Sequence, residues 1–373
     1  MNKVLLLTNT IAPYRIPVLN KINENVNIAF KVWYLEEREK NRDWKINHKE
    51  IKYHYNCLPG IHAYVRRLDM GIHLNFGLFF KLIKESPDTV ITSGYDALGY
   101  WTALVYCKLF RKKYVVWWGS TLNSSVVKNS LVNRIRKFFF KRVDSFITYG
   151  SEATACLTYY GVSFEKIVTG YNTVDISYFY KKANTTGLNE KIEGKPFKFL
   201  FIGQLIPRKG IKELLESLSL IRDLNWEIDI VGSGPEEVAL KKIVESHRLA
   251  NKVYFRGYQQ KENLTGYLEK SDCLVFPSKR EVWGLVVNEA LATNTFVASS
   301  KYAGCTRDII EDKKNGIIID PNDIKEMSIK LKWCIENVDN SDQRIRTSLN
   351  ILRKIHPRYY AKSVVRAIEN ATK

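Results

Sequence analysis

The chain has 373 residues, 45% of them hydrophobic and 26% charged, with a net charge of +19. This is a soluble globular composition with enough apolar side chains for two cores, and the length favours two domains. No stretch approaches the roughly 20 consecutive apolar residues of a membrane-spanning helix, so an integral membrane protein is excluded at this level.

The first 17 residues and the cysteines indicate a cytoplasmic location. The N-terminal run has one lysine, a short apolar stretch and no small-residue cleavage site, which favours a first buried strand over a signal peptide. The six cysteines are scattered and form no C-x-x-C pair. Reduced, mostly buried thiols are therefore expected, rather than disulfides or a zinc site.

The positive charge is the compositional outlier, and the N-terminal half is the more basic per residue. Such an excess suggests an anionic partner, which could be a membrane surface, a phosphorylated substrate or a nucleic acid. The alternative is a basic proteome background or plain solubility, because charge alone does not identify a partner.

Short apolar runs alternate with helix-length amphipathic segments, a rhythm typical of βαβ units and parallel sheets. The first half is predicted to contain strands at 3–8, 27–35, 88–93, 113–118 and 145–149. Helices fit at 15–24, 74–85, 96–110, 128–141 and 151–160. Residues 36–73 are polar with weak periodicity, so a long excursion near the cleft is expected there.

A second alternating series follows the polar, glycine-bearing linker at 184–196. Its strands are predicted at 198–203, 226–232, 252–257, 272–276, 295–299 and 316–320, and its helices at 211–222, 236–248, 261–270, 285–293 and 323–337. The predicted domains are residues 1–180, residues 195–355, and a C-terminal helix at 356–373 that returns to the first domain.

Two glutamates eight positions apart, Glu281 and Glu289, carry the most information about function. Glu281 lies on the loop after the strand at 272–276, and Glu289 lies about two turns further on, in a helix. Parallel sheets bind ligands outside the carboxyl ends of their strands. A carboxylate accepts two hydrogen bonds, which suits sugar hydroxyls, and the adjacent helix N-terminus suits a phosphate. One loop could therefore hold both parts of a sugar nucleotide.

Two further loops of the second half carry candidate residues. Gly203 ends a strand, and Arg208 with Lys209 follows at the start of a helix, a combination that forms an anion site. The alternative is a solvated basic loop. Gly232 opens a Gly-Ser-Gly-Pro turn, which helix-start chemistry explains structurally, with Pro235 at the first helical position.

Together these residues resemble the retaining glycosyltransferases of family 4, which have the GT-B fold of two Rossmann-like doubly wound domains facing each other across a cleft. The matching runs are GQLIPRKGIKELLES, IVGSGPE, VYFRGY, FPSKREVWGLVVNEALA and AGCTRDIIEDKKNGIIIDPND, which cover most of residues 198–338. The first half matches more loosely, through the opening strand, APYRIPVLN and TGYNTVDISYF.

The resemblance implies roles for the matching positions. Glu289 would hold the donor ribose, Glu281 would contact the donor sugar, and Arg208 and Lys209 would neutralise the diphosphate. The residues expected along the sugar and phosphates are Trp283, Gly284, Leu285 and Val286. Such enzymes are thought to react by front-face substitution. No D-x-D motif occurs in the chain, which fits the expectation of no metal and no cofactor besides the donor substrate.

The first half departs from the family pattern. The strand that often ends in a histidine continues here as Trp118, Gly119 and Ser120, and APYRIP replaces the N-terminal Gly-Gly pair. Tyr14 and Arg15 are therefore candidates for binding donor phosphate or an anionic acceptor, the alternative for Arg15 being a surface position at a helix start. Gly94, Tyr95 and Trp118 complete the acceptor-side candidates, whereas Asp96 is expected to be a helix N-cap.

The segment 128–142 combines six basic residues with Leu131, Val132, Ile135 and three phenylalanines. A basic, aromatic-rich amphipathic helix can lie in an anionic membrane interface. The alternative is a helix that packs its apolar residues on its own sheet and leaves its charges in solvent.

These features predict a metal-independent retaining hexosyltransferase-type enzyme that uses a nucleotide-diphosphate sugar and a glycan or lipid-linked acceptor in surface polysaccharide or glycoconjugate synthesis. It would be cytoplasmic, with peripheral contact at the inner face of the membrane. The alternative is another GT-B enzyme, such as a sugar-nucleotide epimerase or a phosphorylase. A nucleic-acid partner is not expected, because the basic residues are dispersed and no nucleic-acid-binding module is visible.

Overall fold

The computed structural model describes residues 1–38, 44, 46–65, 70–124, 129–183, 194–338 and 342–372. The chain divides into two compact units. The first contains Met1–Val174 and the C-terminal residues from Pro357, and the second contains Asp175–His356.

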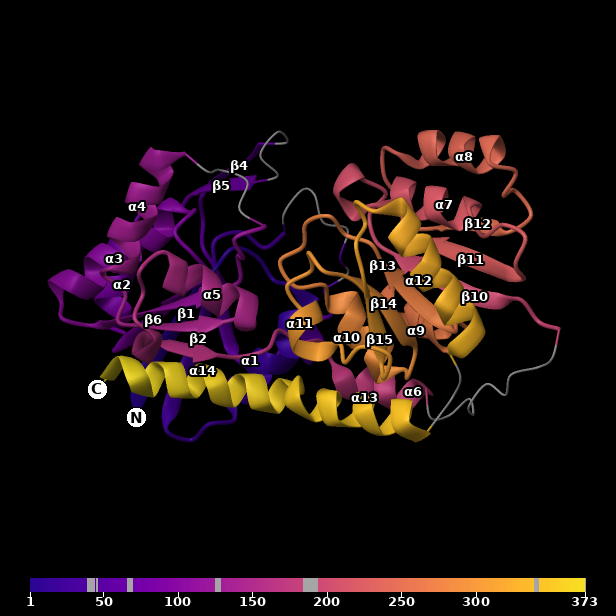
Figure 1. Ribbon diagram of the computed structural model, residues 1–373. Coiled ribbons are helices and arrows are strands. Elements are labelled where there is room, and N and C mark those ends of the chain that lie inside the picture. Colours follow the sequence, from indigo (N-terminus) through magenta and orange to yellow (C-terminus); the bar gives the residue numbers. More distant parts are fainter. Residues whose placement is uncertain are drawn as a thin grey trace. The chain divides into compact units, whose positions relative to one another are not determined.

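A parallel sheet of seven strands, in the order β3-β2-β1-β6-β7-β8-β9, forms the centre of the first unit (Figure 1). The strands are β1 (Asn2–Thr8), β2 (Ile28–Tyr34), β3 (His54–Cys57), β6 (Thr89–Thr92), β7 (Lys113–Trp118), β8 (Ser145–Thr148) and β9 (Ile167–Thr169). The strand order reverses between β1 and β6. This switch point is where an open parallel sheet binds ligands.

Helices cover both faces of this sheet. Successive strand residues point to opposite faces, so neighbouring residues pack against different helices. Trp118 lies in the core with Phe140, at a ring-centroid separation of 5.1 Å, whereas Trp117 packs against Tyr360 of the C-terminal helix at 5.3 Å. The helices are α1 (Ile16–Asn23), α2 (Leu78–Glu85), α3 (Leu98–Leu109), α4 (Ser130–Phe140), α5 (Ser151–Tyr159) and α14 (Pro357–Thr372). Helix α14, yellow in Figure 1, runs alongside α1 and contacts β7, β8 and β9.

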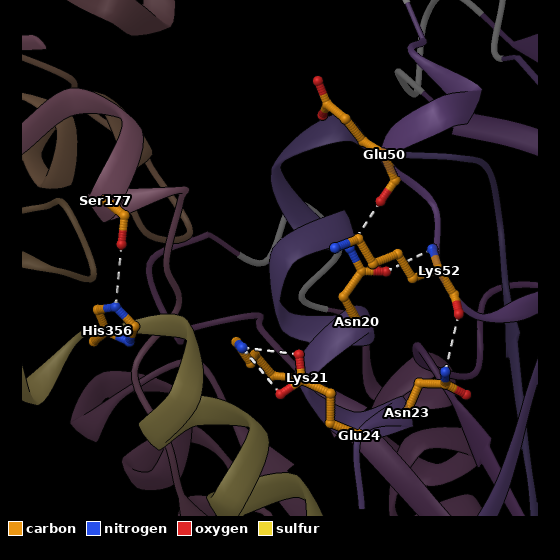
Figure 2. A network of polar contacts seen from close by, with 8 residues as sticks. All are labelled: Asn20, Lys21, Asn23, Glu24, Glu50, Lys52, Ser177 and His356. Carbon is orange, nitrogen blue, oxygen red and sulfur yellow. Dashed lines mark hydrogen bonds and ion pairs between the residues drawn. The ribbon is translucent and has the colours of Figure 1, made fainter. Parts of the chain in front are cut away.

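The polar excursion predicted at 36–73 contains more regular structure than its sequence indicated. Strand β3 pairs with β2, and β4 (Ile61–Val65) forms an antiparallel hairpin with β5 (Met70–Leu74). Figure 2 shows how α1 holds the segment before β3: Asn20 donates to the Glu50 carbonyl at 2.8 Å and accepts from the Lys52 backbone N–H at 2.9 Å. These strands have only four or five residues each, so their pairing depends on contacts distant in sequence.

The second unit repeats the topology with a six-stranded parallel sheet in the order β12-β11-β10-β13-β14-β15. Its strands are β10 (Phe197–Ile202), β11 (Trp226–Val231), β12 (Val253–Gly257), β13 (Cys273–Phe276), β14 (Phe296–Ser300) and β15 (Gly316–Ile319). Its helices are α6 (Ile176–Ala183), α7 (Ile211–Ser219), α8 (Glu237–Ser246), α9 (Lys261–Glu269), α10 (Leu285–Ala292), α11 (Thr306–Ile309), α12 (Ile324–Asn337) and α13 (Asp342–Lys354). The predicted fold class, α/β with two Rossmann-like doubly wound domains, is confirmed.

The domain boundary differs from the prediction, which placed residues up to 180 in the first domain. Helix α6 packs against α9 and α10, so the second unit begins at Asp175. Within this unit, Ser177 at the start of α6 lies 3.4 Å from His356, oxygen to ring nitrogen, as Figure 2 shows. The first and the last residues of the second unit thus lie beside each other. Most of the linker predicted at 184–196 lies outside the described residues.

Candidate functional site

Two loops meet at the switch point of the second unit. One follows β10 and carries Arg208 and Lys209 in a short 3-10 turn (Pro207–Lys209), and the other follows β13 and carries Glu281. The Lys279 backbone N–H donates to the Arg208 carbonyl at 2.9 Å, which joins the loops directly. Because β10 and β13 are adjacent, both loops emerge at the carboxyl edge of the sheet.

The structure brings Glu281, Lys209 and Arg208 into one ionic cluster. The Glu281 carboxylate accepts a hydrogen bond from the Lys209 ammonium, and Arg208 Nη1 lies 3.5 Å from the same oxygen. Burial pushes the pKa of Glu281 upward, but the charge and hydrogen bond of Lys209, aided by Arg208, hold the pKa below its usual range. The three side chains together carry one net positive charge, which leaves the cluster attractive to an anion.

Gly232 supports this cluster from the neighbouring strand end. With φ at 143°, it lies where a Cβ would come within 1.8 Å of the Gly203 carbonyl oxygen, so the loops after β10 and β11 can pack only with glycine there. The Ser233 carbonyl accepts from the Leu205 N–H at 2.9 Å. Helix α8 begins at Glu237, so the expectation that Pro235 opens the helix is wrong: Pro235 lies in the turn before it.

The start of α10 is built around Gly284, its N-cap residue, which has φ 106°. A Cβ there would lie 2.6 Å from the Phe276 ring. Leu285 and Val286 follow in the first turn and are half-buried. Trp283 is buried, and its indole N–H donates to Asn288 Oδ1 at 2.9 Å, so the indole packs inside the protein. The contacts of Trp283, Gly284, Leu285 and Val286 with a donor stay predictions.

Glu289 lies in the second turn of α10 and is half-buried. Burial raises the pKa of Glu289 to about 7, and the charge of Lys261 opposes the rise only in part. Lys261 opens α9, and its ammonium lies 4.2 Å from the centroid of the Tyr178 ring on α6. The side chain thus changes charge near neutral pH, and hydroxyl donors from a ligand would favour the ionised form.

In the first unit, Arg15 occupies the switch point between β1 and β6. Its Nη1 donates to Thr8 Oγ1 at 3.0 Å and to Ser93 Oγ at 3.3 Å, and its Nη2 donates to the Tyr149 hydroxyl. The guanidinium also lies over Trp117, 5.4 Å from the ring centroid. Among the described residues the charges that act on Arg15 include no carboxylate, and the buried Arg15 Nε has no hydrogen-bond partner there. The alternative of a simple surface arginine does not fit this half-buried position.

Tyr14 packs its ring edge-on against Trp44, with the ring centroids 5.9 Å apart. The remaining candidates of the first unit lie on the loop after β6 and at the end of β7. Tyr95 stacks on the buried Trp118 at 5.9 Å and accepts a hydrogen bond from Arg136 of α4 at 2.8 Å. Trp118 thus belongs to the core. Their predicted acceptor contacts, like that of Gly94, stay predictions.

The loop after β6 differs from the prediction in one detail. The N-cap of α3 is Ala97, which makes no side-chain capping bond, and Asp96 is exposed. The expected N-cap role of Asp96 is therefore wrong.

Comparisons with known proteins agree with the geometry of the second unit. Residues 168–348 match the model of the family Glycosyl transferases group 1. An uncharacterized glycosyltransferase of Methanocaldococcus jannaschii is 26% identical over 212 residues, 55% of either chain. A D-inositol 3-phosphate glycosyltransferase of an Arthrobacter species is 26% identical over 179 residues, 46% of this chain and 42% of that protein. The chain thus spans about half the length of the curated relatives it matches.

The solved structures extend the likeness to both units. The crystal structure of Anabaena Alr3699/HepE in complex with UDP is similar with a TM-score of 0.74, at 15% sequence identity, over 98% of this chain and 99% of that one. At this identity the likeness shows the fold, and it places the chain in the GT-B class.

Helix α4 has two apolar sides. Phe139 and Phe140 are buried in the core, whereas Leu131, Ile135 and Phe138 are 61%, 41% and 51% exposed. The exposed three are spaced by four and three residues, so they form one stripe. The packing of apolar residues on the unit's own sheet is confirmed, although Arg136 is buried against Tyr95 and Tyr160 rather than solvated. The membrane contact stays a prediction. Lys128 lies outside the described residues. Among the residues that the structure describes, no helix is long and apolar enough to cross a membrane.

The sequence did not single out several residues that shape the site. The charge of Lys261 acts on Glu289, the Lys279 backbone joins the loops after β10 and β13, and Thr8, Ser93 and Tyr149 accept hydrogen bonds from Arg15. For Lys279, its position in the FPSKRE run was an available signal. The others lie at strand or helix ends, where only the strand order shows which side chains meet.

Proposed function

We propose that the protein is a retaining glycosyltransferase, which moves a hexose-type sugar from a nucleotide-diphosphate donor to a hydroxyl group of a glycan or lipid-linked acceptor. The observation that carries the proposal is the cluster of Glu281, Lys209 and Arg208 at the switch point of the second unit. A carboxylate for sugar hydroxyls and two cations for phosphates stand on adjacent loops, which is the chemistry that a sugar nucleotide requires.

In this proposal the donor lies across the carboxyl edge of β10 and β13. Glu289 accepts hydrogen bonds from the ribose hydroxyls, and the N–H groups at the start of α10 face a phosphate. Glu281 contacts the sugar. The Glu281 carboxylate also pairs with Lys209 and Arg208, so that the ammonium and guanidinium groups are positioned before the diphosphate arrives.

The chemical step separates the sugar from the diphosphate, which gains negative charge as it leaves. Fixed cations and helix N–H groups stabilise such charge best when they need not move during the reaction. Lys209 and Arg208 supply this stabilisation in our proposal. It includes metal-independent transfer, because the chain has no D-x-D motif to place a divalent ion on the diphosphate. The acceptor hydroxyl attacks the anomeric carbon from the face that the diphosphate leaves and passes its proton to the departing phosphate oxygen, which retains the anomeric configuration.

The similar proteins support a nucleotide-sugar donor. The Anabaena protein of similar fold was crystallised with UDP, and the Arthrobacter relative is named for glycosyl transfer involving D-inositol 3-phosphate. The second of these acts on a phosphorylated partner, which agrees with the positive charge of this chain.

For the acceptor we propose an anionic group bound by Arg15, a phosphate being the best fit. A half-buried guanidinium held by hydroxyls, with one nitrogen unsatisfied, carries a desolvation cost that an incoming anion would offset. A lipid-linked acceptor with a phosphate would place this anion near a membrane. The exposed stripe of α4, with Arg134, Lys137, Lys141 and Arg142 nearby in sequence, would then contact the inner face of the membrane from the cytoplasm.

A donor screen tests the proposal. The purified protein is incubated with UDP-, GDP-, ADP- and dTDP-sugars, and release of the nucleoside diphosphate is measured with and without an acceptor extract. One donor should give release that the double variant Arg208→Ala/Lys209→Ala loses. Release from none of them, with no nucleotide binding by calorimetry, would overturn the proposal.

A further inference from the structure

The β4–β5 hairpin of the first unit brings together two histidines and a glutamate that no step of the proposed reaction uses. His62 on β4 is paired directly with His73 on β5, and Glu36 follows the end of β2. One potential ligand atom from each of the three lies within 4.8 Å of the other two. The three positions are far apart in sequence, so only the folded hairpin unites them.

Two of the three distances between these atoms are close to the edge lengths of a metal-centred tetrahedron, and the third is at most 4.8 Å. The two imidazole Nδ1 atoms are 3.2 Å apart, and His73 Nδ1 lies 3.6 Å from Glu36 Oε2. Zinc bonds of 2.0–2.2 Å to nitrogen and oxygen place neighbouring tetrahedral ligands about 3.3–3.5 Å apart. The observed separations need little adjustment to surround one ion.

Hydrogen bonding alone satisfies this arrangement poorly. Two neutral imidazoles that face each other through Nδ1 share one proton, and the carboxylate oxygen at 3.6 Å is beyond normal hydrogen-bond length. His73 is 2% exposed. With the proton of each ring on Nε2, the two Nδ1 lone pairs and the Glu36 carboxylate face one another, and a divalent cation between them would accept all three.

The surrounding backbone fixes the three residues before any ion binds. The Asn75 amide, two residues after His73, donates to the carbonyl of Leu35 at 2.9 Å and to that of Leu58 at 3.3 Å. Leu35 directly precedes Glu36. One side chain thus joins the end of β5 to the end of β2, so the ligand atoms are held on rigid elements, as a metal site requires.

We propose that Glu36, His62 and His73 bind one transition-metal ion of the zinc class, with a fourth position open to water, and that the ion fastens the hairpin to the end of β2. Two imidazoles with one carboxylate suit zinc and cobalt better than magnesium or calcium. The sequence predicted no metal site because the three residues show no ligand spacing along the chain. The proposal concerns the first unit alone and is independent of the donor chemistry assigned to the second.

Cobalt(II) titration of the untagged, chelator-treated protein tests the site. We expect one equivalent to give the visible absorption of four-coordinate cobalt, and zinc to displace it. Glu36→Gln, His62→Gln and His73→Gln should each weaken binding by more than the ~10–100-fold typical of losing an outer-shell partner. His48→Gln is the matched control, since exposed His48 also lies 3.6 Å from a glutamate oxygen, on Glu37, and it should bind like wild type.

Thermal unfolding provides a second measurement. Zinc should raise the melting temperature of the wild type and of His48→Gln but not of His62→Gln. Because His62 is only half-buried, this variant keeps the test valid if His73→Gln fails to fold. A wild type that binds no cobalt, or a His62→Gln variant that binds it as tightly as the wild type, would overturn the proposal. UDP-sugar binding is measured in parallel, and its presence or absence does not bear on the metal site.

Discussion

The two units share a strand order but treat the cation at the switch point differently. In the second unit, Lys209 on the loop after β10 forms an ion pair with the Glu281 carboxylate on the loop after β13. In the first unit, Arg15 on the loop after β1 donates a hydrogen bond to the Ser93 hydroxyl on the loop after β6.

The cation of the second unit is therefore neutralised by a carboxylate of the protein, whereas the cation of the first unit is not. A buried cation paired with a carboxylate recovers much of its desolvation cost, whereas one held by neutral hydroxyls recovers less. The second unit can therefore hold its cations ready for a diphosphate. In the first unit the charge of Arg15 is not neutralised by a carboxylate, and we propose that an anionic group of the acceptor neutralises it.

The largest effect is expected from removing both cations of the second unit. Arg208→Ala/Lys209→Ala should lower kcat/KM by ~10³-fold or more, because each removed donor to a developing charge typically costs ~10²–10³-fold in rate. Steady-state transfer measures it, with Lys212→Ala/Lys241→Ala as the control, since these exposed lysines pair along their own helices. A double variant as active as the wild type would remove the basis of the comparison.

Glu289 should make stability depend on pH. Its pKa is about 7 in the folded protein against an ordinary 4.5, so the folded state holds the proton longer than the unfolded state does. The favourable contribution is complete below pH 4.5 and is lost as pH rises through 7. Glu289→Gln should therefore raise the free energy of unfolding at pH 8 by up to about 3 kcal/mol and leave it nearly unchanged at pH 4.5.

Urea unfolding at the two pH values measures this effect. Glu262→Gln, on the exposed start of α9, is the control and should show no such difference. Equal stabilisation by Glu289→Gln at both pH values would show that the carboxyl group does not titrate as described.

Glu289→Ala should also weaken nucleotide binding by ~10–100-fold, the worth of hydrogen bonds to a charged group. Calorimetry with the donor found in the screen measures the affinity. Binding above pH 7 should exceed binding at pH 5.5, since the ionised carboxylate accepts ribose hydroxyls. Unchanged affinity in the variant would separate Glu289 from the donor site.

Arg15→Met tests the incomplete site of the first unit. We expect the KM for an anionic acceptor to rise by about 10-fold or more, the scale of one charge-assisted hydrogen bond, while the dissociation constant of the donor nucleotide stays the same. Lys21→Met, in the exposed last turn of the helix that Arg15 precedes, is the control. A loss of donor affinity instead would assign Arg15 to the donor phosphate.

The smallest effect concerns α4. Leu131→Ser/Phe138→Ser should reduce binding to vesicles of anionic lipid several-fold and leave transfer to a water-soluble acceptor unchanged, because the two exposed side chains supply only part of the apolar stripe. Vesicle sedimentation measures the bound fraction. Equal binding by the variant would leave the stripe without a membrane role.

The sequence by itself determined the alternation of strands and helices, and it singled out Glu281, Arg208 and Lys209, which the structure brings together. Runs such as DCLVF and KFLFIG are buried on both faces of a parallel sheet, and this local pattern is sufficient to recognise them. The position of Glu281 and Glu289 at a strand end and in the next helix followed from the same local pattern.

Only the tertiary structure decided which side chains meet. Lys209 and Glu281 are 72 residues apart, and the adjacency of β10 and β13 joins them. The hairpin that unites His62, His73 and Glu36 pairs two strands of five residues each, which are too short for a sequence pattern to predict their pairing. Arg15 is the clearest case: its sequence suits a surface helix start as well as a binding site. The strand order buries it among hydroxyls, because the ends of β1, β6 and β8 converge there.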